Sequence, residues 1–347
     1  MSDAPLLEVD GLEKEFVVNG GIVSRLLGTT RRLRAIRDVS FDIEAGETVG
    51  LVGESGAGKS TVGNVITRQL QPTAGEVRFR GQNVHSLSGD DLREFRQSVQ
   101  MVFQDPHSSL DPRYSIGRTL AEPLKIHTDL DKSERRERVE ELLETVNLDP
   151  NFRNRYPHEL SGGQLQRVSI AGALTVDPEF VILDEPVSAL DVSVQARILN
   201  LLMRLQEEHG LSYLLISHDL GVVKHICDRT AVLYLGEIVE HGRTRGLFEN
   251  PTHPYTEGLL ASIPQPDPHA KKSGQRLGGE IPSAENPPSG CSFHPRCAYA
   301  TELCARENPP LEAVADDRDT ACHHWREVSD DHAEAPANDQ ADVGASD

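Results

Sequence analysis

Short apolar runs alternate with longer amphipathic stretches along most of the chain. Runs typical of strands are residues 7–16, 35–43, 76–79, 180–183, 213–216 and 231–235. The run Phe180-Val181-Ile182-Leu183 has no polar interruption, which is typical of a central strand buried on both faces. Helical spacing appears between residues 105 and 174, and again where Ile198, Leu202 and Leu205 fall on one face before Gly210. Strands that alternate with helices predict an α/β fold with a mostly parallel sheet.

The amino-acid composition changes after residue 242, where prolines become frequent. We therefore predict a first domain over residues 1–262 and a small Pro- and Cys-rich domain over residues 263–326. Residues 327–347 are acidic and rich in small side chains, a composition that predicts a disordered tail.

The bulk composition narrows the class of protein. The formal net charge of -20 argues against a nucleic-acid binder, which needs a basic surface. The acidity indicates an ordinary acidic surface or, because lysine is scarce beside arginine, adaptation to a salty cytoplasm. No run approaches the ~20 apolar residues of a spanning helix, and the N-terminus lacks a signal pattern. We expect a cytoplasmic chain whose membrane association, if any, is peripheral.

The strongest motif lies between an apolar strand and a helix. Residues 53–60, Gly-Glu-Ser-Gly-Ala-Gly-Lys-Ser, fit G-x-x-x-x-G-K-[ST]. Glycines let backbone N–H groups face phosphate oxygens, Lys59 would pair the β- and γ-phosphates, and Ser60 would hold Mg²⁺. A glycine-rich turn that binds nothing is the alternative, but it would not explain the flanking strand and helix.

A pair of acids follows the buried strand. Asp184 and Glu185 stand where ligands bind in open α/β sheets, at the carboxyl end of a strand. Asp184 would anchor Mg²⁺, and Glu185 would polarise the attacking water as general base. With Lys59, the pair predicts a nucleotide triphosphatase.

A second glycine motif, Leu160-Ser161-Gly162-Gly163-Gln164, opens another helix and has no lysine of its own. It indicates either an anion cradle that completes a phosphate site supplied elsewhere, or a simple helix cap by Ser161.

In the order of these motifs, residues 1 to about 262 resemble the nucleotide-binding domain of ATP-binding-cassette (ABC) transporters. The resemblance implies a P-loop NTPase cassette with an antiparallel β subdomain and a helical subdomain over about residues 105–175. It implies a Mg²⁺-dependent ATPase with catalytic Glu185, His218 and Gln104, and with Mg²⁺ near Ser60, Gln104 and Asp184. It also implies that two subunits face head to tail, so that Ser161 and Gly163 of one meet the γ-phosphate on the other. The residues expected to contact ATP are Phe16, Gly53, Ser55, Gly56, Gly58, Lys59, Ser60, Thr61, Ser161, Gly162, Gly163, Gln164 and Asp191.

Two of these assignments compete with plainer interpretations. Phe16 occupies the adenine-stacking position of the family but could equally be a core aromatic. His218 follows a strand that ends at Ser217, and a lone histidine there is usually a surface or core residue. The resemblance instead implies that His218 contacts the γ-phosphate and orients Glu185 and the water.

A narrower resemblance is to the oligopeptide/dipeptide importer ATPases. It is carried by Gln104-Asp105-Pro106, by residues 251–256 (Pro-Thr-His-Pro-Tyr-Thr) and by residues 287–297, which end His-Pro-Arg-Cys. The resemblance implies transmembrane permease partners, a second ATPase subunit of the same or a similar kind and, indirectly, an extracytoplasmic substrate-binding protein. Relatives also carry nickel or other small solutes.

Four cysteines crowd into the Pro-rich segment. Cys291, Cys297, Cys304 and Cys322 are separated by five, six and seventeen residues, whereas Cys227 lies far off and is expected to be a small core residue. Four thiolates suit a metal site, and the family interpretation is a [4Fe–4S] cluster. Zinc is the alternative, although the C-x₂-C spacing usual for zinc is missing, and four reduced buried thiols are the plain interpretation.

Two other classes of protein share parts of this pattern. A soluble cassette ATPase of DNA repair or translation is disfavoured because no long coiled coil separates Gln104 from Ser161, and because the charge is negative. A redox-sensing regulatory protein is the third class. The sequence favours an ATPase that powers peptide import.

Overall fold

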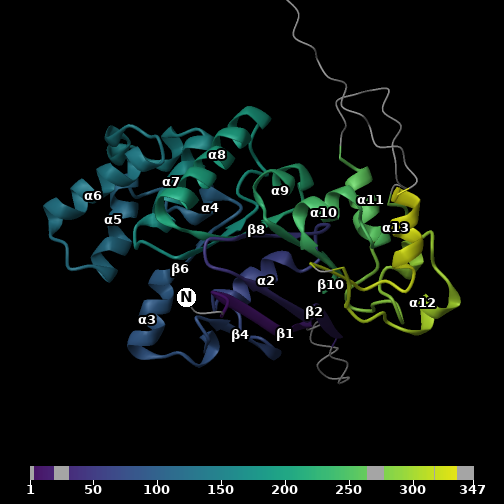
Figure 1. The fold of residues 1–347 in the computed structure, drawn as a ribbon. Coiled ribbons are helices and arrows are strands. Elements are labelled where there is room, and N and C mark those ends of the chain that lie inside the picture. The colour runs from purple at the N-terminus through teal and green to yellow at the C-terminus, as the bar shows by residue number, and fades with distance from the viewer. Residues whose placement is uncertain (1–3, 19–30, 264–276, 316, 334–347) are drawn as a thin grey trace, which may run out of the picture.

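The computed structural model describes residues 4–18, 31–263, 277–315 and 317–333. Its centre is an eight-stranded sheet in the order β11-β12-β10-β9-β3-β8-β7-β6 (Figure 1). Neighbouring strands from β9 to β6 run parallel, whereas β10, β12 and β11 add antiparallel pairs at one edge. The bounds are β6 Val99–Val102, β7 Phe180–Asp184, β8 Ser212–Ser217, β3 Thr48–Val52, β9 Arg229–Tyr234, β10 Glu237–Arg243, β12 Arg318–Thr320 and β11 Glu312–Ala315.

The central strands are apolar on both faces because each face carries its own core. Val181 and Leu183 of β7 join the core beneath the helical part of the chain, whereas Phe180 and Ile182 join the core beneath the antiparallel strands. This alternation follows the two-residue period of a strand. The uninterrupted apolar run that predicted a doubly covered strand is thus explained.

An antiparallel sheet in the order β2-β1-β4-β5 covers one side of the cassette. Helix α2 lies between this sheet and the central one, since its Val62 and Ile66 share a core with Leu7 of β1 and Leu51 of β3. The bounds are β1 Leu7–Val18, β2 Arg31–Ile43, β4 Ala74–Phe79, β5 Gln82–Asn83, η1 Val84–Ser86, α2 Lys59–Ile66 and α3 Gly89–Ser98.

The helices predicted between residues 105 and 175 form a group at one end of the molecule, far from the C-terminal segment (Figure 1). They are α4 Pro106–Ser109, α5 Ile116–His127, α6 Lys132–Thr145, η2 Pro150–Asn154, η3 Pro157–Glu159 and α7 Gly162–Leu174. Helix α8, Val192–His209, ends where Gly210 takes a left-handed conformation with φ of 65°, as the sequence predicts. The cassette continues through α9 Leu220–Ile226, α10 Thr244–Glu249 and α11 Pro254–Ala261.

The Cys-rich segment extends the central sheet. Its strand β12 pairs with β10 of the cassette, so that Thr320 lies opposite Glu240. Its other elements are η4 His294–Arg296, α12 Glu302–Arg306 and α13 Trp325–Ala333. Helix α13 includes residues 327–333, so the tail predicted to be disordered from residue 327 is helical over its first part. Residues 334–347 lie outside the described residues.

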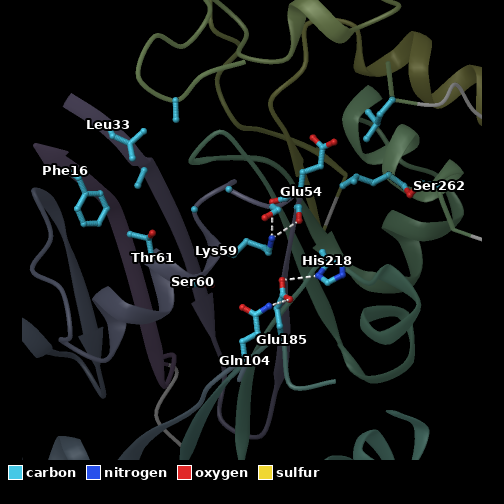
Figure 2. A pocket seen from close by; sticks show the side chains of 18 of the residues that line it. Phe16, Leu33, Glu54, Lys59, Ser60, Thr61, Gln104, Glu185, His218 and Ser262 are labelled. Atoms are coloured by element: carbon cyan, nitrogen blue, oxygen red, sulfur yellow. Dashed lines mark hydrogen bonds and ion pairs between the residues drawn. The ribbon is translucent and has the colours of Figure 1, made fainter. Parts of the chain in front are cut away.

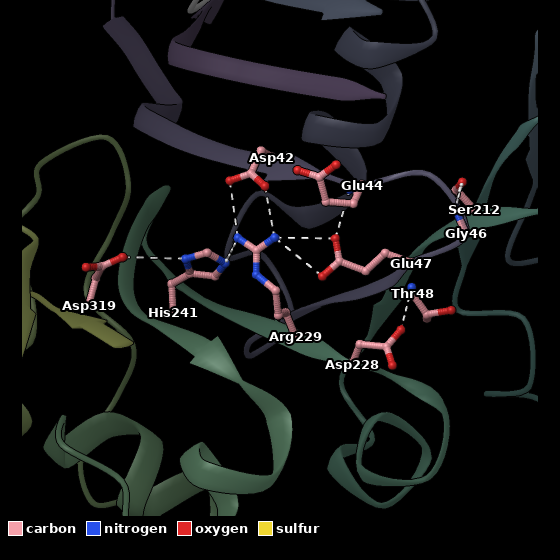
Figure 3. A network of polar contacts seen from close by, with 10 residues as sticks. All are labelled: Asp42, Glu44, Gly46, Glu47, Thr48, Ser212, Asp228, Arg229, His241 and Asp319. Atoms are coloured by element: carbon pink, nitrogen blue, oxygen red, sulfur yellow. Dashed lines mark hydrogen bonds and ion pairs between the residues drawn. The ribbon is translucent and has the colours of Figure 1, made fainter. Parts of the chain in front are cut away.

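A polar network links the antiparallel sheet, the central sheet and the C-terminal segment (Figure 3). Arg229 of β9 forms a two-pronged ion pair with Asp42 of β2, at 2.9 and 3.2 Å, and a further ion pair with Glu47 at 3.3 Å. His241 of β10 lies 3.2 Å from Arg229 and 3.7 Å from Asp319, which belongs to the C-terminal segment. The antiparallel sheet, the cassette and the C-terminal segment therefore share one cluster of charges.

Within the described ranges, no helix is both long and apolar enough to cross a membrane.

Candidate active site

The carboxyl ends of four neighbouring parallel strands bring the predicted site together. The loop 53–58 follows β3, Asp184 ends β7, His218 follows β8, and Gln104 lies just beyond β6. Ligands of open α/β sheets bind at this edge because the strands all end there. The sheet order therefore gathers residues that lie far apart in the sequence.

The loop 53–58 winds tightly before helix α2. Gly58 has φ of 109°, and a Cβ placed there would lie 2.3 Å from the carbonyl oxygen of Ala35. A side chain at this position would collide with β2 and strain the backbone, so glycine is required. The loop is thus pressed against the antiparallel sheet, with the amides at the start of α2 behind it.

Lys59 lies inside this loop with only 5% of its surface exposed. Its ammonium donates hydrogen bonds to the carbonyl oxygens of Gly53, at 2.7 Å, and Glu54, at 3.1 Å. Burial lowers the pKa of Lys59, and the nearby carboxylates of Glu185, Asp184 and Glu54 oppose that shift. The ammonium is therefore held against the backbone of the loop 53–58.

Asp184 and Ser60 form the acidic side of the site. The Ser60 hydroxyl donates to Asp184 at 3.1 Å, and Asp184 is buried at the end of β7. Burial raises the pKa of Asp184, while the Ser60 hydrogen bond acts against that rise. A hydroxyl and a carboxylate together supply the oxygen ligands that Mg²⁺ prefers.

Glu185 is held by two neighbours (Figure 2). Gln104 donates to one carboxylate oxygen at 2.8 Å, and Nδ1 of His218 lies 3.0 Å from the other. The backbone of Glu185 adopts φ of 46°, an uncommon conformation for a residue with a side chain. Backbone strain of this kind clusters at functional sites, where the surrounding structure fixes one side-chain direction.

These groups open into a cavity of about 1010 Å³. Phe16 and Leu33 line one end, on strands of the antiparallel sheet, whereas Gln104, Glu185 and His218 lie together elsewhere in the cavity (Figure 2). Phe16 is half-buried on the cavity wall, outside the two hydrophobic cores. The cavity is also lined by Gly53, Ser55, Gly56, Gly58, Ser60 and Thr61. An apolar end and a phosphate-binding loop suit an elongated nucleotide.

The second glycine motif lies outside this cavity. Ser161 and Gly162 are exposed at the start of α7, where the Gln164 side chain accepts a hydrogen bond from the Ser161 N–H at 2.9 Å. Gly163 packs against α8, since a Cβ there would lie 2.5 Å from Cγ1 of Val194. Asp191 caps α8 by accepting from the Val194 N–H at 3.0 Å. The motif and Asp191 thus adjoin each other at the surface and do not reach the phosphate loop of their own chain.

The four C-terminal cysteines form no disulfide with one another, and Cys291, Cys297 and Cys304 lie near enough to Cys322 to raise the pKa of its thiol. The Cys291 N–H donates to the Cys304 carbonyl oxygen at 2.8 Å. Burial raises the pKa of the Cys297 thiol to about 11 and that of Cys322 to about 12. No three His, Cys, Asp or Glu side chains in the described part of the chain are arranged to hold a metal ion. The metal cluster stays a prediction, and Cys227 lies against the core as expected.

Sequence reasoning missed residues of the C-terminal third that build the cavity. Leu277 and Ala284 line it, the Tyr255 hydroxyl accepts from the Glu54 N–H at 2.8 Å, and Arg296 pairs with Glu54. Tyr255 and Arg296 stand in the two stretches that carry the importer resemblance. That resemblance was the only signal in the sequence, and it assigned them no role.

Comparisons with known proteins agree with this geometry. Residues 36–188 match the family described as "ABC transporter", and residues 239–304 match "Oligopeptide/dipeptide transporter, C-terminal region". The chain is 49% identical to the putative oligopeptide transport ATP-binding protein YkfD of Bacillus subtilis, over 94% of this chain and 97% of that one. It is 47% identical to the oligopeptide transport ATP-binding protein AppF of the same organism, over 92% of this chain and 97% of that one.

A solved structure has the same fold. The dimeric ABC transporter cassette MJ0796, bound to ADP and phosphate in a post-hydrolysis state, superposes with a TM-score of 0.61 at 31% identity. The superposition covers 69% of this chain and 99% of that one, which confirms the predicted cassette fold. The chain belongs to the ATP-binding-cassette family, as an ATPase of its oligopeptide/dipeptide transporter branch.

Proposed function

We propose that this chain hydrolyses ATP to power the import of oligopeptides or dipeptides through a membrane transporter. The observation that carries the hydrolytic part is the carboxylate of Glu185, held at 2.8 Å by Gln104 and at 3.0 Å by His218 beside the phosphate loop. A fixed carboxylate there can accept a proton from water as the water attacks the γ-phosphate. Lys59 would neutralise charge on the β- and γ-phosphates, and Ser60 and Asp184 would hold Mg²⁺.

The adenine would stack on Phe16, whose half-buried ring faces the cavity. The Lys14 ammonium also lies over the Phe16 ring, 5.2 Å from its centroid. Ser55, Gly56 and Thr61 line the cavity near the triphosphate in this arrangement.

Two subunits would form the complete site. Ser161, Gly162, Gly163, Gln164 and Asp191 lie outside the cavity of their own chain, and Ser161 and Gly162 are exposed. Because α7 begins at this motif, its amides offer a site for the γ-phosphate held by a facing subunit. The dimeric structures of the related cassette MJ0796 support this arrangement.

A permease would contact the ATPase near Gln104 and receive there the conformational change that ATP binding and hydrolysis cause. Phe103 precedes this glutamine and exposes 41% of its surface, so it is available for contact with a partner. A membrane partner that covers Phe103 would sense whether Gln104 holds Glu185. The chain would then work at the cytoplasmic face of the membrane, with a substrate-binding protein acting through the permease.

The C-terminal cysteines would hold a [4Fe–4S] cluster. Such a cluster takes four thiolates. Cys291, Cys297, Cys304 and Cys322 form no disulfide, and the first three lie near enough to Cys322 to raise the pKa of its thiol. Zinc, which also binds thiolates, is the alternative occupant. Burial raises the pKa values of Cys291, Cys297 and Cys322, so their thiols are protonated when free and binding would release protons. Iron and sulfide analysis of anaerobically purified protein tests the cluster, and the absence of both elements would refute it.

Transport is tested with the intact complex. The chain is purified with its co-purifying membrane subunits, placed in vesicles, and ATP-driven peptide uptake is measured. The Lys59→Ala variant in the same complex is the control. We expect peptide uptake only with ATP and an intact Lys59; ATP hydrolysis that no peptide stimulates and that drives no uptake would refute the peptide assignment while leaving the ATPase intact.

A further inference from the structure

The C-terminal segment reaches into the phosphate loop through one side chain. Arg296, which ends the short helix η4, forms a two-pronged ion pair with the carboxylate of Glu54, at 2.7 and 3.0 Å. The two residues lie 242 positions apart in the sequence. The side chain of Arg296 is only 4% exposed and that of Glu54 24%, so water screens this pair weakly.

Glu54 is a residue of the phosphate loop that is held at three points. Its N–H donates to the hydroxyl of Tyr255, at 2.8 Å, and its carbonyl oxygen accepts from the Lys59 ammonium, at 3.1 Å. Arg296 holds its side chain. The N–H, the carbonyl oxygen and the carboxylate of Glu54 therefore each have a partner. These contacts fix the backbone conformation of the loop just before Gly56 and Gly58.

Glu54 also lines the nucleotide cavity. A carboxylate in the wall of a triphosphate site repels its ligand unless a cation offsets its charge. The guanidinium of Arg296 supplies that charge, and the fork geometry of the pair fixes the direction of the carboxylate. The Glu54 ion pair raises the pKa of Arg296, so this cation stays protonated at any physiological pH.

Arg296 fixes a second part of the cavity wall. Its Nε donates to the carbonyl oxygen of Gly278 at 3.0 Å, beside Leu277, which lines the cavity. The guanidinium also lies over the rings of Tyr234 and Phe293, each 5.8 Å from the centroid. One side chain thus joins the phosphate loop to residues 277–278, of which Leu277 lines the cavity.

We propose that Arg296 is a positioning residue for ATP: it fixes and neutralises Glu54, so that the C-terminal segment completes the nucleotide site of the cassette. This inference rests on the ATP binding proposed above. It assigns the Cys-rich segment a role in the nucleotide site that does not depend on what its cysteines bind.

The test separates charge compensation from simple structural support. We compare the affinity for MgATP and the steady-state kinetics of the full-length wild-type chain with R296Q, R296K, E54Q and the double variant E54Q/R296Q. The matched control is R306Q, which removes an exposed arginine of the same segment that pairs with exposed Glu302, at 2.9 Å. Thermal unfolding is followed for every variant.

R296Q is expected to raise both Kd and KM for ATP about tenfold, the order expected for one uncompensated charge at a partly screened site. The change in kcat should stay within about twofold, because the groups around Glu185 are untouched. R296K keeps the charge without the fork, so its affinity should fall between those of the wild type and R296Q. The double variant E54Q/R296Q should recover most of the lost affinity, because the repelling carboxylate is gone.

Two outcomes overturn the inference. The first is unchanged ATP affinity in R296Q while Lys59→Ala abolishes binding, which would leave the proposed function standing. The second is a loss in R296Q that E54Q does not restore and that follows the fall in melting temperature, which would make the pair a structural contact only. Absence of ATP binding by the wild-type chain would instead defeat the proposed function itself.

Discussion

Replacing Glu185 by glutamine isolates the chemistry of the proposed general base from its geometry. The amide has nearly the shape of the carboxylate, so it can keep the position defined by the backbone φ of 46°. Its oxygen can still accept the hydrogen bond from Gln104, now 2.8 Å long. Its NH₂ group would face Nδ1 of His218, now 3.0 Å from the carboxylate, and that nitrogen can accept in one neutral tautomer.

The magnitudes show which loss dominates. Weakening one of the two hydrogen bonds costs about 0.5–1.5 kcal/mol. Loss of general-base catalysis lowers the rate by about 10²–10⁴-fold, which corresponds to roughly 2.7–5.5 kcal/mol of activation free energy. The hydrolysis rate of Glu185→Gln should therefore fall by at least about a hundredfold, while ATP affinity remains close to that of the wild type.

Single-turnover hydrolysis of labelled ATP measures the chemical step, and size-exclusion chromatography measures the dimer. With hydrolysis blocked, ATP should hold two subunits together through the phosphate loop and the exposed motif at Ser161. Gln104→Ala is the companion variant, since it removes one neighbour of Glu185 and keeps the carboxylate; its rate should fall less. Turnover of Glu185→Gln within about tenfold of the wild type would refute Glu185 as the base, because a general base contributes more than that.

Three further substitutions test separate parts of the structure. Lys59→Ala removes the ammonium that bonds to Gly53 and Glu54 and should abolish detectable ATP binding in calorimetry; retained affinity would contradict its phosphate role. Gly163→Ala places a Cβ 2.5 Å from Val194 and should lower the free energy of unfolding by about 1–3 kcal/mol. Gly172→Ala in the same helix has its nearest neighbour at 3.8 Å, so equal losses in urea unfolding would refute the packing argument. Burial lowers the pKa of His253 to about 3, so the folded state resists its protonation and stability should fall as pH drops from about 6.5 toward 3. This residue adds a slope of up to about 1.4 kcal/mol per pH unit, and His253→Asn, which can still cap the Tyr255 N–H, should remove it; an unchanged slope would contradict the assignment.

The site residues that the sequence identified share one property: their roles follow from local patterns. The loop 53–60 is recognisable because its glycines and Lys59 act within a few residues of one another, between a strand and a helix. Asp184 and Glu185 are recognisable because they end an uninterrupted apolar run. Parallel strands end at one edge of a sheet, so these local motifs already implied a common site, and the structure brings Gln104 and His218 to it.

The sequence could not decide which distant segments would support that site. Arg296 and Glu54 contact each other across 242 residues, and neither lies in a repeating pattern that predicts the other. The C-terminal segment looked like a separate small domain because its prolines break regular structure. Its strand β12 instead pairs with β10, and pairing of that kind depends on which sheet edge the folded cassette leaves open.

The sequence by itself therefore predicted the chemistry of this protein: a phosphate loop, an acid proposed to bind Mg²⁺ and a proposed general base, each recognisable from a few adjacent residues. Only the tertiary structure decided that the Cys-rich segment belongs to the same site. The physical reason is that a local motif needs only the geometry of its own backbone. Arg296 and Glu54 can meet only after β9 has paired with β3 and the C-terminal segment has packed against that part of the sheet.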